Sequence, residues 1–371
     1  MNPVVSNRMD SVQALRALAF LGIFLFHAEF WMNWPELGVS VFFVLSGFLL
    51  YINNCNVNLN TSHRACFRFS IHRVKKLYPL HILTMSCAII LSLISFVRDG
   101  VDVKGIVVLL AKIGLNITLL QTWIPYSNIN TSLNGVAWFL SVTMFLYFTF
   151  PKLLKLIRKA KCGVALGLCL LCIFGGILLC IPMVYVLGSD SKIYGWFMYS
   201  FPIFRLTDFC VGCCVGRFFL FAKEKNFEII IASLLEIFTL ALTIIVLKIV
   251  ANSDNFLLSA IFNRTSIYIP LAALWVFVFA MRKGIITIVL SNPLLIKLGN
   301  ISQYLFLIHY VITQYCNYFL DSMDKPLDTH YRYMLIALEL LVSILISCLY
   351  RRYEAKFLII ISKRYYKKID C

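Results

Sequence analysis

The sequence is built from long apolar runs separated by short polar segments. An α-helix needs about 17–25 apolar residues to cross the ~30 Å hydrocarbon core of a bilayer, and the runs have this length. A membrane barrel would instead show alternating segments of about ten residues, a pattern that the sequence lacks. Ten helical spans are predicted: Ala14–Trp31, Leu37–Ile52, Leu77–Val97, Gly135–Leu154, Gly163–Leu187, Met198–Phe221, Glu228–Val250, Ser266–Met281, Gly299–Leu320 and Tyr333–Tyr350.

Composition supports a membrane protein and excludes a soluble one. Hydrophobic residues make up 61% of the chain and charged residues 14%, whereas soluble domains have roughly 45–50% apolar and ~25% charged residues. We find no Ser- or Pro-rich linker that would divide the chain. The sequence therefore predicts an all-α, polytopic transmembrane bundle that fills residues 1–371 as a single membrane-embedded domain.

Basic residues predict how this bundle is oriented in the membrane. The net charge is +17, and the cations form short clusters between spans, which is typical of cytoplasmic loops facing anionic lipid rather than of nucleic-acid binding. Clusters at Arg64–Lys76 and Lys152–Lys161 follow the second and fourth spans. With both clusters inside, about ten helices span the membrane and both termini are cytoplasmic, including a basic tail at 355–371. An eleventh apolar stretch, Gly105–Thr122, then makes no net crossing, and it is expected to be re-entrant or to lie at the outer interface. The polar loop Ile124–Asn134 is expected outside.

Titratable groups inside a span are costly and are therefore candidates for function. The first span contains Arg16 near its cytoplasmic end and His27 deeper in the membrane. Eleven residues are about three helical turns, so the two side chains share nearly one face, ~16 Å apart. A neutral imidazole can take a proton from a hydroxyl near pH 7, and a guanidinium can bind phosphate. Taken alone, the pair also fits a snorkelling arginine and a packing histidine.

The segment from Arg16 to His27 resembles the Arg-x10-His signature of acyltransferase family 3, the membrane O-acyltransferases of bacterial surface glycans. Further segments resemble later blocks of this family in the family's order: Leu37–Phe48, Arg73–Pro79, Trp138–Pro151, Pro202–Gly212 and Leu298–His309. The resemblance covers residues 8–354. It implies an O-acyltransferase that transfers acyl groups other than amino-acyl groups.

Two positions depart from the family pattern. Lys76 replaces the second arginine of a basic block, and Thr143 stands where many members have glutamate. If that glutamate is a base, its loss affects catalysis; if it orients a partner or binds the acceptor, its loss changes substrate choice. Both alternatives stay open at this point.

The resemblance and the residue chemistry together give a set of expected roles. His27 and Arg16 are expected to be catalytic, and Arg73 and Lys76 are expected to bind the donor at the cytoplasmic face. Arg205 and Asp208 are three residues apart and are expected to pair, either as a structural pair or as part of the acceptor pocket. The substrate-pocket candidates are Ser46, Trp138, Thr143, Arg205, Asp208 and His309.

The function expected from these features is polysaccharide O-acetylation or a related acyl transfer in the cell membrane, most simply a bacterial inner membrane. The donor substrate is expected to be cytoplasmic acyl-coenzyme A, with acetyl-CoA as the first candidate. The acceptor would be a hydroxyl of a surface glycan or glycolipid precursor at the outer side. The expected partners are these substrates and the lipid bilayer, without nucleic acid, and no metal is expected. The alternative is a multi-pass transporter or flippase without acyl transfer, which ten helices with buried charge also suit.

Overall fold

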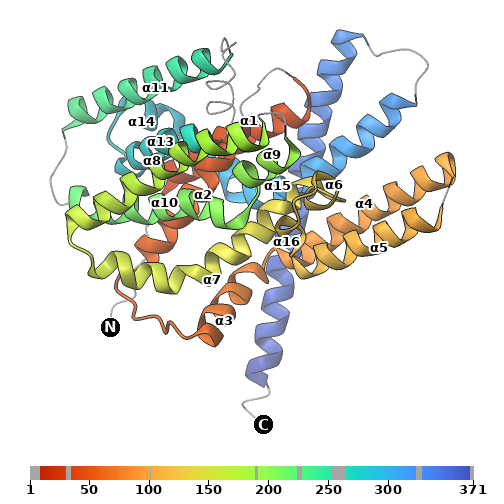
Figure 1. Cartoon of the computed structure of the whole chain (residues 1–371), viewed down its shortest axis with the longest axis horizontal. Coiled ribbons are helices and arrows are strands. Elements are labelled where there is room, and N and C mark those ends of the chain that lie inside the picture. The colour runs from red at the N-terminus through yellow and green to blue at the C-terminus, as the bar shows by residue number, and fades with distance from the viewer. Residues whose placement is uncertain are drawn as a thin grey trace.

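The computed structural model describes residues 9–30, 35–100, 102–188, 191–223, 228–251, 265–322 and 328–367, and its regular elements over these ranges are all helical (Figure 1). The α-helices are α1 (Asp10–His27), α2 (Pro35–Asn54), α3 (His63–Val74), α4 (Tyr78–Asp99), α5 (Val103–Thr118), α6 (Ser127–Asn130), α7 (Trp138–Lys159), α8 (Cys162–Leu187), α9 (Lys192–Tyr199), α10 (Pro202–Lys223), α11 (Ile229–Ala251), α13 (Tyr268–Met281), α14 (Ile285–Leu290), α15 (Pro293–Asp321) and α16 (Thr329–Lys367). Short 3₁₀ turns lie at Gln121–Trp123, Gly135–Ala137 and Thr265–Ile267.

Eight of the described helices are long and apolar enough to cross a membrane: α1, α2, α4, α7 with the turn before it, α8, α11, α15 and α16. The other two predicted spans also coincide with helices. Helix α10 carries Arg205, Asp208 and Arg217, and α13 is a shorter apolar helix of 14 residues. The prediction of an all-α, polytopic bundle is therefore confirmed. The predicted basic tail continues α16 as helix up to Lys367, and its last residues lie outside the described ranges.

Neighbouring helices run in the directions that alternating spans require. Helices α1 and α15, the first and ninth spans, are parallel: Gln13 lies beside Gly299, and His27 lies beside Tyr310 further along both helices. Helix α16, the last span, runs antiparallel to α15, because Thr313 bonds to Glu339 and the earlier Tyr304 contacts a later part of α16. These directions agree with ten crossings; which side faces the cytoplasm remains a prediction from charge.

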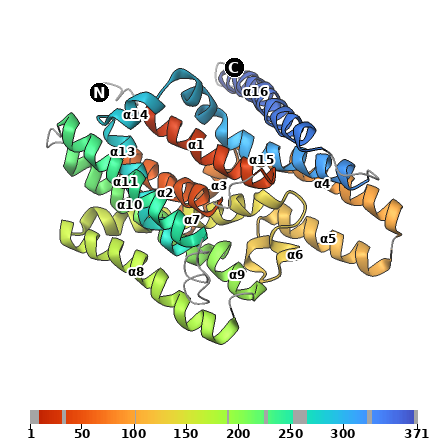
Figure 2. The ribbon, with the colours of Figure 1, turned by 90° about the horizontal axis from the view of Figure 1, so that it is seen from above.

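Helix α2 lies at the centre of the bundle, against α1, α10 and α13 (Figure 2). It approaches α10 so closely that backbones touch. A Cβ on Gly212 would lie 2.0 Å from the carbonyl oxygen of Val44, and a Cβ on Gly47 would lie 2.1 Å from that of Phe209. Small residues permit such close packing of membrane helices, so α2 and α10 form one parallel unit.

Helix α5 runs back along α4, and the two lie side by side at one edge of the bundle (Figures 1 and 2). At the far end of α5, the hydroxyl of Tyr78 donates to the carbonyl of Ile117 at 2.8 Å. The chain then doubles back, since Leu133 packs against Met85 of α4 and Leu109 of α5. Helix α7 follows in the same direction as α2. The chain between α4 and α7 thus runs out along α5 and back, a course that fits the prediction that this segment makes no net crossing.

The polar loop after α5 is partly buried in the protein. Asn134 donates to the carbonyl of Leu307 at 2.9 Å, and both Asn130 and Ser132 are buried. Ser127 remains exposed. Asn134 therefore holds the loop against α15, whereas Asn128 and Thr131 are exposed like Ser127.

Candidate active site

A basic cavity of about 280 Å³ opens among α1, α2, α7, α15 and the segment that joins α3 to α4. It brings together five residues singled out from the sequence, which come from four parts of the chain far apart in sequence: Arg16, Ser46, Arg73, Lys76 and Thr143. Asn53, Tyr147 and Gln303 also line it and were not predicted as site residues. Tyr147 lies one helical turn after Thr143, and this spacing could have indicated a shared face.

The segment before α4 places two of the cations at the cavity. Ser62 caps α3 by accepting a hydrogen bond from the backbone of Ala65 at 3.3 Å, and the helix ends at Val74. Arg73 lies over the Phe69 ring, 5.2 Å from its centroid. Lys76 lies 5.7 Å from the centroid of the Tyr304 ring of α15. Proline in the first turn of α4 starts the next helix directly afterwards, so both cations stay beside the cavity.

The charged residues that line the cavity are all cations. Arg16, Arg73 and Lys76 line it, and its described lining contains no carboxylate. Clustered cations with apolar walls concentrate anions, and arginine matches the geometry of phosphate oxygens. The cavity therefore suits an anionic ligand such as a nucleotide phosphate.

Three hydroxyl groups, from Ser46, Thr143 and Tyr147, line the cavity. Ser46 and Tyr147 lie within 3.3 Å of each other through their hydroxyl oxygens. Thr143 donates its hydroxyl to the carbonyl of Phe139 at 2.7 Å. A glutamate at position 143 would thus occupy the wall of the basic cavity, and the departure from the family pattern lies there rather than next to His27.

His27 ends α1 beyond this cavity and contacts two side chains of α15. Its ring centroid lies 5.4 Å from that of His309 and 4.8 Å from that of Tyr310. His309 is fully buried, and its Nδ1 lies 3.0 Å from the carbonyl oxygen of Leu305. Because a carbonyl only accepts, Nδ1 carries the proton and Nε2 is left as an acceptor. This Nε2 has no hydrogen-bond partner within the described parts of the chain. His309, a pocket candidate from the sequence, thus lies beside His27 and does not line the basic cavity, and Tyr310 next to it was not a candidate.

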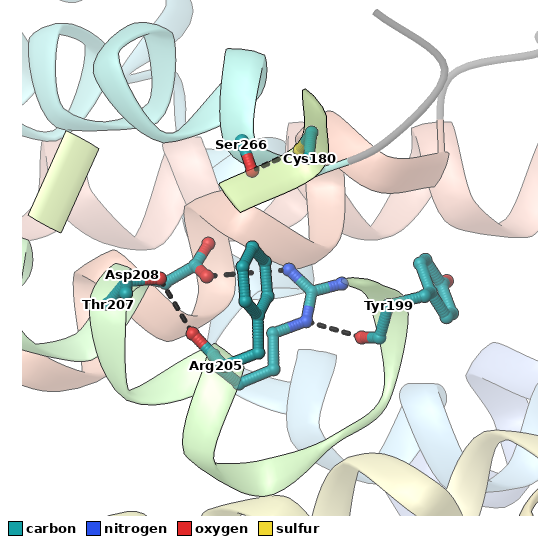
Figure 3. A network of polar contacts seen from close by, with 7 residues as sticks. Cys180, Tyr199, Arg205, Thr207, Asp208 and Ser266 are labelled. Carbon is teal, nitrogen blue, oxygen red and sulfur yellow. Dashed lines mark hydrogen bonds and ion pairs between the residues drawn. The ribbon is translucent and has the colours of Figure 1, made fainter. Parts of the chain in front are cut away.

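Arg205 and Asp208 form the predicted ion pair, with a distance of 3.5 Å between Nη1 and Oδ2, and both side chains are fully buried. Figure 3 shows the two side chains pointing toward each other, with the Tyr199 carbonyl facing the guanidinium. Nε of Arg205 donates to this carbonyl at 2.5 Å. The guanidinium also lies 5.3 Å from the ring centroid of Phe43 and 5.6 Å from that of Trp138. The pair and Trp138 do not line the basic cavity, so they form a separate buried cluster.

The geometry thus arranges the predicted residues in three groups: the basic cavity, the histidine contact and the buried ion pair. Continuous helix links the first two, because Arg16 lines the cavity and His27 lies on the same helix, α1. The rise of an α-helix puts their Cα atoms ~16 Å apart.

Comparisons with known proteins identify the family of this chain. The sequence profile of one family, described as an acyltransferase domain, matches residues 9–360. The acyltransferase MdmB of Streptomyces mycarofaciens is 26% identical over 340 residues, which cover 83% of this chain and 80% of that protein. No solved structure matches. A match over nearly the whole chain favours acyl transfer over the transporter alternative. The chain belongs to the acyltransferase 3 family, and it is a multi-pass membrane enzyme that transfers acyl groups.

Proposed function

We propose that the protein moves an acyl group, acetyl in the first instance, from cytoplasmic acyl-coenzyme A to a hydroxyl of a surface glycan or glycolipid precursor. The observation that carries this proposal is the basic cavity, which joins Arg16, Arg73 and Lys76 at the base of the helix that ends in His27. In the proposed orientation these cations bind the phosphates of coenzyme A. The thioester arm then extends along α1 toward the histidines.

His27 is the proposed general base. It takes the proton of the acceptor hydroxyl while the hydroxyl oxygen attacks the thioester carbonyl carbon. The carbon–sulfur bond then breaks, an ester forms, and the coenzyme A thiolate takes up a proton as it leaves. His309, with its acceptor nitrogen unoccupied, is the proposed positioning residue for the His27 ring or for the hydroxyl.

The first test replaces the base. His27→Ala is expected to lower acyl transfer by about 10²–10⁴-fold, the usual cost of losing a general base, while expression and thermal unfolding stay as in the wild type. His330→Ala is the matched control, because His330 is exposed at the start of α16. Transfer is measured as coenzyme A released from acetyl-CoA by purified protein with a lipid and glycan extract of the native cells. More than about a tenth of wild-type activity in His27→Ala would remove this histidine as the base.

The second test addresses the donor site. Arg73→Ala is expected to raise the KM for acetyl-CoA more than the KM for the acceptor, because Arg73 lines the basic cavity. Arg68→Ala is the control, since Arg68 is an exposed cation of the same helix and does not line the cavity. With the acetyl thioester of dephospho-coenzyme A, the effect of Arg73→Ala should shrink if the lost contact is to the 3′-phosphate. An unchanged donor KM would show that these cations only orient the protein in the membrane.

The acceptor class is tested in cells. Mass spectrometry of surface glycans with and without the protein should reveal an acyl ester that depends on His27. An ester found on a small secreted molecule instead of a glycan would keep acyl transfer and correct the acceptor.

A further inference from the structure

Three phenylalanine rings from three different helices contact one another at one end of the basic cavity. Phe42 belongs to α2, Phe139 to α7 and Phe306 to α15. Their ring centroids are 6.1 Å apart for Phe42 and Phe139, 5.9 Å for Phe42 and Phe306, and 5.0 Å for Phe139 and Phe306. All three distances lie within the range of interacting aromatic pairs. We call this triangle the aromatic barrier.

The barrier lies at the end of the cavity where its lining residues on α2 and α7 stop. Along α2 the cavity lining runs from Asn53 to Phe42, and along α7 it runs from Tyr147 to Phe139. The two phenylalanines are thus the last lining residues on their helices. Asn53 and Tyr147 lie toward the helix ends that approach the basic segments, because α2 and α7 run in the same direction.

The histidine contact lies on the other side of the barrier. Phe306 and His309 are one turn apart on α15, and their ring centroids are 6.1 Å apart. His27 follows at 5.4 Å from His309. The Phe139 ring also stacks on the fully buried Phe43 ring, with 4.3 Å between the ring centroids, and this contact restricts its movement. The barrier therefore separates the basic cavity from the proposed base by about one layer of side chains.

We propose that the aromatic barrier is the acyl-length filter of the enzyme, an inference that rests on the proposed function. The thioester carbonyl has to reach a hydroxyl at His27, so the acyl group must pass among these rings. Close-packed side chains yield little room, and each methylene in an apolar pocket changes selectivity by about 10–200-fold. The rings admit a two-carbon acyl group and hinder longer chains.

The test compares donors of different length. Coenzyme A release from acetyl-, butyryl- and octanoyl-CoA is measured for purified protein in nanodiscs, with the native lipid and glycan extract as acceptor. The wild type is expected to prefer acetyl-CoA. Phe139→Ala is expected to raise the ratio of kcat/KM for butyryl-CoA to that for acetyl-CoA by at least about 10-fold. Phe148→Ala is the control, because Phe148 belongs to the same helix and does not line the cavity.

A second, more conservative variant distinguishes a change in donor selectivity from misfolding. Phe139→Leu keeps an apolar side chain and shortens it, so it should move the same ratio in the same direction by a smaller factor. An unchanged ratio in an active Phe139→Leu or Phe139→Ala enzyme overturns the filter and leaves the proposed function standing. A wild type that releases coenzyme A from no donor, with the glycans unmodified in cells, overturns the proposed function and the filter together.

Discussion

Replacing Gly212 by alanine should destabilise the contact between α2 and α10, which organises the centre of the bundle. The added Cβ would lie 2.0 Å from the carbonyl oxygen of Val44, whereas ordinary contacts begin at 3.4 Å. The obstacle is backbone and cannot rotate away, so the two helices must separate. Overpacking costs about 1–3 kcal/mol, and a backbone clash places this variant at the upper end. About 3 kcal/mol corresponds to roughly a 100-fold change in the folding equilibrium.

The assay is the midpoint of thermal unfolding in detergent at one fixed heating rate, since unfolding of such proteins is often irreversible. Gly212→Ala should lower the midpoint by about 5 °C or more. Gly167→Ala is the matched control: this glycine lies within α8, is exposed, and has nothing within 4 Å of an added Cβ. That variant should keep or raise the midpoint, because alanine favours helix over glycine by about 1 kcal/mol.

Gly47→Ala tests the same contact from α2, where the Cβ would meet the Phe209 carbonyl at 2.1 Å. Since both variants separate the same two helices, the double variant should cost less than the sum of the single ones. Gly212→Ala and Gly167→Ala with equal midpoints would refute the argument that backbone contact at this point sets the helix spacing.

Two further predictions concern the buried ion pair and the polar loop after α5. Asp208→Ala should destabilise the protein by about 3–5 kcal/mol, because it leaves the fully buried Arg205 without its carboxylate partner. The double variant Arg205→Met/Asp208→Leu should unfold at a higher temperature than Asp208→Ala. The reverse order of unfolding temperatures would contradict the pairing. Ser127→Cys, at an exposed loop position, should react with an impermeant maleimide on intact cells above the wild-type background, whereas Asn130→Cys, at a buried position, should not. Labelling of Ser127→Cys only after the cells are opened would show that the loop faces the cytoplasm.

Local features of the sequence were enough to predict the class of fold and the order of the helices. The length of an apolar run decides whether a segment can cross a bilayer, and loop charge decides its direction. Run length and loop charge each depend on a stretch of about 20 residues, and each predicted span coincides with a helix. The spacing of Arg16 and His27 was equally local, because one continuous helix carries both.

The structure alone decided which of the distant polar residues meet. Thr143 and Ser46 belong to the basic cavity, whereas Trp138, only five residues before Thr143, packs on the buried Arg205 instead. His309 lies against His27 although 281 intervening residues separate them in sequence. An apolar helix shows no clear polar stripe that would indicate its partner, so the pairing of faces depends on side-chain fit and on close backbone approaches such as that at Gly212. The kind of chemistry was therefore visible in the sequence, while the group of three aromatic rings between the basic cavity and the histidines arises only when α2, α7 and α15 pack together.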